Sequence, residues 1–150
     1  MPKSGLIIAL SLVLPLLWTG NTRAADEREL VKLPAMMQAH MLANMRDHLV
    51  ALDAMLMALA EGNVDKAAKL AESRLGMSSL ELHGAAHMAK FMPKAMAAIG
   101  TRMHHAASRF VIAARNAELE PGLEAQHKVY RALQAITENC NACHQAYRIR

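Results

Sequence analysis

The chain has 150 residues, of which 53% are hydrophobic and 20% charged. This length fits one domain, alone or behind a targeting segment, and the apolar content excludes an intrinsically disordered chain. The formal net charge of +4 comes from interspersed acids and bases without a long basic block, so nucleic acid is not an expected partner. Because Ala, Leu and Met dominate while β-branched residues are sparse, the composition predicts helices rather than sheets.

Residues 1–24 have the pattern of a secretory signal peptide. Lys3 supplies a positive charge, residues 6–18 form an apolar run, and Ala24 is the small residue before the predicted cut. An uncleaved anchor is the alternative, but the apolar run is shorter than the roughly 20 residues of a membrane span. We therefore expect a soluble mature chain, residues 25–150, in the periplasm.

The first predicted helix runs from Pro34 to Glu61. Its apolar residues recur at spacings of four and three, which is typical of a helix packed in a bundle. This stripe consists of Met41, Met45, His48, Leu52, Met55 and Leu59. Gly62 ends the helix, Asn63 can cap the next one, and we expect that second helix over residues 64–75.

A long third helical stretch is expected from Ser78 to about Ala117. Ser78 and Glu81 have the spacing of a capping box, and Pro93 should kink or break the stretch, which leaves open whether 78–92 is a separate helix. Its apolar stripe is Gly84, Met88, Met92, Met96, Ile99, Met103 and Phe110.

The last predicted helix runs from about Leu123 to Tyr147, after a turn at Pro121-Gly122. One face carries Leu123, His127, Tyr130, Leu133, Thr137, Cys140, His144 and Tyr147. No segment alternates with the period of a strand. The sequence therefore predicts an all-α fold, an antiparallel four-helix bundle.

The chemistry of the chain is concentrated in residues 140–144, which have the sequence Cys-Asn-Ala-Cys-His, the attachment signature of c-type haem. On a helix, Cys140, Cys143 and His144 share one face, so two thiols can bond one porphyrin edge while the imidazole lies under the iron. A disulfide, a zinc site or a thioredoxin-like pair are the alternatives. The use of both cysteines and the following His favour covalent haem.

The stretch Cys-Asn-Ala-Cys-His-Gln-Ala-Tyr-Arg over residues 140–148, near the C-terminus of a helical chain, resembles the class II c-type cytochromes. These include cytochrome c′ and its low-spin relatives. The resemblance implies haem c between the first and last helices of a four-helix bundle, with His144 as the proximal ligand. Lys32-Leu33-Pro34 replaces the aromatic–Arg pair common early in the first helix of this family, so the chain resembles a divergent branch.

The residue on the other side of the iron is predicted from the antiparallel run of the first and last helices. At about 1.5 Å rise per residue, the level of His144 falls near the start of the Met41–Met45 stripe. We expect Met45 as the distal ligand, with Met41 second and His48 or His40 after them; a vacant site is the remaining possibility. Arg46 beside Met45 is the expected partner of a haem propionate, and Arg148 is a second candidate.

A second set of soft donors lies in the centre of the chain. His83 and His87 are four residues apart and form a possible two-ligand metal clip, and His104 and His105 follow later. Met88, Met92, Met96 and Met103 line the adjacent stripe. Thioethers suit Cu(I), although a helical Met stripe is more commonly packing.

Together these features predict an exported mono-haem electron carrier with His/Met ligation, and not an enzyme. Its partners would be redox proteins, and the resemblance allows a homodimer. A five-coordinate haem that binds NO or CO is the alternative function. A Met/His copper-binding protein is a third.

Overall fold

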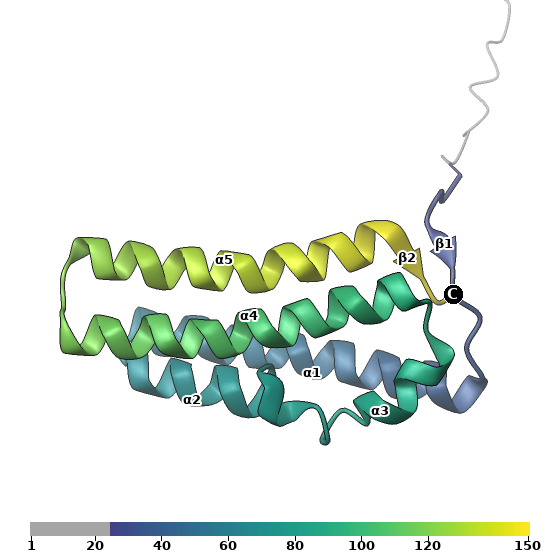
Figure 1. Cartoon of the computed structure of the whole chain (residues 1–150), viewed down its shortest axis with the longest axis horizontal. Helices are drawn as coiled ribbons and strands as arrows, with labels where there is room; N and C mark the ends of the chain where they lie inside the picture. Colours follow the sequence, from purple (N-terminus) through teal and green to yellow (C-terminus); the bar gives the residue numbers. More distant parts are fainter. Residues whose placement is uncertain (1–24) are drawn as a thin grey trace, which may run out of the picture.

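A computed structural model describes residues 25–150, so the predicted signal peptide lies outside the described residues. The described chain is all-α, as predicted, and its four long helices run along the long axis of the molecule (Figure 1). These are α1 (Ala35–Ala60), α2 (Val64–Arg74), α4 (Lys94–Leu119) and α5 (Leu123–Ala146). Between α2 and α4 lie the 3-10 helix η1 (Met77–Ser79), the short α3 (Ala85–Met88) and the 3-10 helix η2 (Ala89–Phe91).

The junction between α1 and α2 forms as the sequence predicts. Gly62 has φ +75°, and its N–H donates to the carbonyl of Leu59 while the N–H of Asn63 donates to Ala58, which satisfies two terminal carbonyls of α1. The side chain of Asn63 then accepts a 3.0 Å hydrogen bond from the N–H of Lys66 and caps α2.

The prediction of a long helix from Ser78 was wrong for its first part. Ser78 does not form a capping box with Glu81; its hydroxyl donates to Glu72 at 2.6 Å, and Gly84 adopts a left-handed φ of +59°. Pro93 breaks the stretch instead of kinking it, because its extended ψ of 142° places it at the start of α4 rather than inside a helix.

Packing runs from α1 to α2, from α2 to α4 and from α4 to α5. The main core lies where these helices meet, and Met55, Leu75, Phe110 and Ile136 are its largest fully buried side chains. Many of the contacts between them are made by alanines, whose small side chains let the helices approach closely.

The expected stripe of α5 was wrong in its first half. Leu123, His127 and Tyr130 are exposed, and Val129 and Ile136 are the buried residues of this helix. The spacing of seven between these two puts them on one face, which continues through Cys140 and Cys143 toward the C-terminal end.

A short contact that no local signal predicted joins the two ends of the described chain. The two-residue strands β1 (Glu29–Leu30) and β2 (Tyr147–Arg148) pair in parallel next to the end of α5 (Figure 1). Arg28, just before β1, donates a 3.3 Å hydrogen bond to the carbonyl of His144. Within residues 25–150, none of the helices combines the length and apolarity that a membrane span requires.

Candidate cofactor site

A cavity of about 450 Å³ lies between the C-terminal end of α5, the N-terminal half of α1 and the N-terminal half of α4. This volume is within the range of roughly 300–1,000 Å³ common for cofactor and ligand sites. All three residues of the predicted attachment motif line it, and so do Met41 and Met45 from α1. Residues predicted from distant parts of the sequence are therefore brought to one cavity.

The motif lies in the last turns of α5, where the helix contributes all three side chains to one wall of the cavity. Cys140 and Cys143 are half-buried free thiols, and burial raises the pKa of both. Cys140 packs against the main core and Cys143 against a second apolar cluster that contains Met37, Met41 and other methionines. The two sulfurs are thus fixed at the boundary between core and cavity.

The facing wall comes from α1. Met41 is 8% exposed, Met45 is half-buried and His48 is 8% exposed, and the three line the cavity because their four-three spacing keeps them on one helix face. The two residues considered as distal ligands, Met41 and Met45, therefore both line the cavity. His40, the other histidine considered for this role, instead donates its Nε2–H to the carbonyl of His83 at 2.9 Å.

Arginines stand at the end of the cavity next to the terminal strands. Arg28, Arg148 and Arg150 line the cavity, whereas Arg46 is exposed and does not line it. The Nε of Arg148 is buried without a hydrogen-bond partner among the described residues, 3.6 Å from the Asp26 carboxylate. Sequence analysis missed Arg28 because its position depends on strand pairing between the two ends of the chain.

The remaining wall carries the central methionines and two histidines. Met88, Met92, Met96 and Met103 line the cavity with His83 and His104. His83 and His87 do not share a helical face as the possible metal clip required, because Gly84 separates them with a left-handed turn, and His87 is exposed, with its ring near Phe91. His83 is 5% exposed and faces inward.

His83 instead belongs to a cluster of three buried imidazoles, with His48 from α1 and His104 from α4. The ring centroids lie 4.6 Å apart for His48 and His83, 5.7 Å for His83 and His104, and 6.0 Å for His48 and His104. Burial lowers the pKa of all three, for His48 to about 4. Sequence spacing held no signal for this cluster, because its members come from three separate elements.

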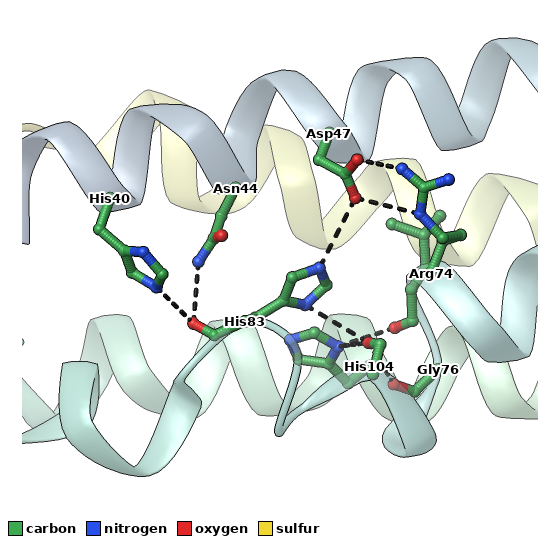
Figure 2. Close-up of polar contacts among 9 residues, drawn as sticks. His40, Asn44, Asp47, Arg74, Gly76, His83 and His104 are labelled. Atoms are coloured by element: carbon green, nitrogen blue, oxygen red, sulfur yellow. Dashed lines mark hydrogen bonds and ion pairs between the residues drawn. The ribbon is translucent and has the colours of Figure 1, made fainter.

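Hydrogen bonds from α1 position the segment that carries His83 (Figure 2). The carbonyl of His83 accepts from His40 Nε2 at 2.9 Å and from Asn44 Nδ2 at 3.0 Å. Asp47, one turn further along α1, lies 3.8 Å from His83 Nε2 and accepts hydrogen bonds from Arg74, whose guanidinium holds the Asp47 pKa below its usual range. The outer side of the cluster is therefore an ion pair of zero net charge.

Behind the rings, Ser79 and two carbonyl groups complete the network. The Ser79 hydroxyl donates to the carbonyl of Gly76 at 2.7 Å, and the Nδ1–H of His104 donates to the carbonyl of Leu75 at 2.7 Å. His83 Nδ1 lies 3.4 Å from the Ser79 oxygen.

Taken as His, Cys, Asp and Glu donors alone, residues 25–150 contain no group of three or more arranged to hold a metal ion. Comparisons with family models, curated proteins and solved structures find no match to this chain.

Proposed function

We propose that this chain is an exported mono-haem c-type cytochrome that carries electrons between redox partner proteins. Cys140 and Cys143 would hold haem covalently, His144 would be the proximal ligand, and Met45 the distal one. The fold would then be an antiparallel four-helix bundle with the haem between α1 and α5. The observation that carries the proposal is that one cavity is lined by both thiols, the imidazole and the facing thioethers.

The chemistry of the donors fits the group. Two thiols and an imidazole on one face of α5 supply attachment and proximal ligation, and Met41 and Met45 offer soft sulfur from the facing helix. The buried Nε of Arg148 makes no hydrogen bond among the described residues and could donate one to a carboxylate at the arginine end of the cavity, where Arg28 also lies. These two arginines replace Arg46 as the propionate partners that we propose.

A bound haem would supply a one-electron couple at its iron. The chain's own part would be to hold Met45 and His144 on helices that are packed beside them, since Met41 on α1 is buried and Cys140 on α5 packs against the core. Ligands held in place on a rigid frame need not move when the charge changes, which favours electron transfer. The methionines that line the cavity would limit the access of water to a bound haem, and a thioether ligand would favour a raised reduction potential.

The full precursor, produced in a bacterial host with a periplasmic cytochrome c maturation system, tests the proposal. We expect the purified protein to keep its haem on a denaturing gel, and the Cys140→Ala/Cys143→Ala variant to lose it. His144→Ala should mature poorly and lose the native optical spectrum. A wild-type protein without covalent haem, or a double variant that still stains for haem, would overturn the assignment.

A further inference from the structure

Two of the buried imidazoles have an Nε2 atom that makes no hydrogen bond to any described residue. His48 Nε2 and His83 Nε2 are inaccessible and have no hydrogen-bond partner there, and their residues are only 8% and 5% exposed. The 3.8 Å from His83 Nε2 to Asp47 is too long for a hydrogen bond. Buried polar atoms in native proteins nearly always have a partner, so the two Nε2 atoms are candidate ligands for a bound atom or ion.

The hydrogen bonds behind the rings determine which nitrogens are free. Ser79 uses its proton on the carbonyl of Gly76, so its oxygen accepts from the Nδ1–H of His83. His104 uses its Nδ1–H on the carbonyl of Leu75. The rings of His83 and His104 therefore carry a lone pair on Nε2, as metal-binding imidazoles do when their other nitrogen donates to a carbonyl or hydroxyl group. His48 contributes its buried Nε2, which has no hydrogen-bond partner among the described residues.

From these contacts we propose that His48 and His83, together with a thioether of the adjoining cavity wall, form a Cu(I) site distinct from the haem-attachment motif. Met103 is the thioether that we assign first, because it lines the cavity in the same turn of α4 as His104. The His104 ring packs against both imidazoles and supports them.

The donor set selects the metal. Residues 25–150 contain no group of three or more His, Cys, Asp or Glu side chains arranged to hold a metal ion, which argues against a zinc site. Thioethers and imidazoles remain, and this combination suits Cu(I). Among the described residues, Asp47 is the carboxylate next to the cluster, and it is paired with Arg74. These surroundings are neutral overall, so a monovalent cation is less costly to bury there than a divalent one.

Cu(I) transfer from the chromophoric chelator bathocuproine disulfonate, under reducing and anaerobic conditions, tests the site. The Cys140→Ala/Cys143→Ala variant is measured beside the haem-loaded protein, so that free thiols do not contribute. Both should take up one Cu(I). Binding by the variant without haem would separate this site from the proposed cytochrome function, because it would persist even if haem attachment were disproved.

The ligands are tested by His48→Leu/His83→Leu, with His87→Leu/His105→Leu as the matched control at exposed histidines. We expect the first pair to weaken Cu(I) binding by roughly 100-fold or more, since loss of even an outer-shell partner costs about 10–100-fold, and the control pair to leave it unchanged. If the first pair does not fold, Met103→Leu and X-ray absorption of the copper-loaded wild type replace it, with nitrogen and sulfur neighbours expected. No uptake, equal loss in the control, or a copper neighbourhood without nitrogen would overturn the proposal.

Discussion

The imidazole rings of His48 and His83 lie edge to face with their centroids 4.6 Å apart, although one residue belongs to α1 and the other to the irregular segment before α3. Asn44 and His40 hold this segment in place through the carbonyl of His83. Both rings line the cavity that the Cys140–His144 motif lines from α5.

If Met45 is the distal ligand, Met45→Ala should convert a low-spin ferric spectrum to a high-spin one and let CO bind the ferrous protein readily. The weak near-red band of a Met–iron bond should disappear with it. Met41→Ala is the matched control and should do much less, since one thioether occupies the axial position. A wild type that is already high-spin and binds CO at once would favour the NO/CO-binding alternative, and the change appearing in Met41→Ala would move the ligand to Met41.

Arg148→Met keeps most of the side-chain length and removes the charge next to the cavity. We expect the reduction potential to fall, because a cation beside a propionate favours the more negatively charged ferrous state. Potentiometric titration measures this, with Arg46→Met as the control at an exposed position outside the cavity lining. Equal shifts in the two variants would reject the assignment of Arg148.

Asn44→Ala should destabilise the folded protein by about 1–2 kcal/mol, because the partly buried carbonyl of His83 loses one of its two donors. Amide hydrogen exchange in residues 80–91 should speed up more than in α5. Denaturant unfolding gives the free energy, and Asn116→Ala at an exposed position of α4 is the comparison. Unchanged exchange in 80–91 would show that this segment is held by other contacts.

Glu72 links α2 to η1 and α4, because its carboxylate accepts from the backbone and hydroxyl of Ser78 and from the hydroxyl of Ser108. Burial opposes its ionisation, but these hydrogen bonds outweigh burial and hold the pKa below the ordinary value of 4.5. The stabilisation is therefore present above that pH and is lost as the pH falls through the lower folded-state pKa.

Glu72→Gln should cost about 1–3 kcal/mol at neutral pH and flatten the fall in unfolding free energy on acidification. Glu81→Gln, at an exposed residue, should keep the wild-type pH profile. Urea unfolding between neutral and acidic pH measures both. If the two variants give the same profile, the carboxylate of Glu72 is not the group responsible.

Local sequence signals were sufficient where neighbours in the chain supply the interaction. The ends of α1 and the start of α2 are set by Pro34, Gly62 and Asn63, whose φ preferences and capping hydrogen bonds involve only residues a few positions away. The one-face arrangement of Cys140, Cys143 and His144 likewise follows from helical spacing alone. The third helix does not begin at Ser78 as predicted, because the Ser78 hydroxyl donates a hydrogen bond to Glu72, six residues earlier, instead of forming a capping box with Glu81.

Tertiary structure alone decided which residues meet across the cavity. Helical periodicity places His48 and His104 on the inner faces of α1 and α4, but it cannot state which turn of one helix faces which turn of another. This alignment of the helices depends on close packing of alanines in the core and on the break at Pro93. It also depends on the hydrogen bonds from α1 to the carbonyl of His83, which hold that residue against the cavity. Arg28 reaches the end of α5 for a similar reason, since strand pairing joins residues at opposite ends of the chain that share no local pattern.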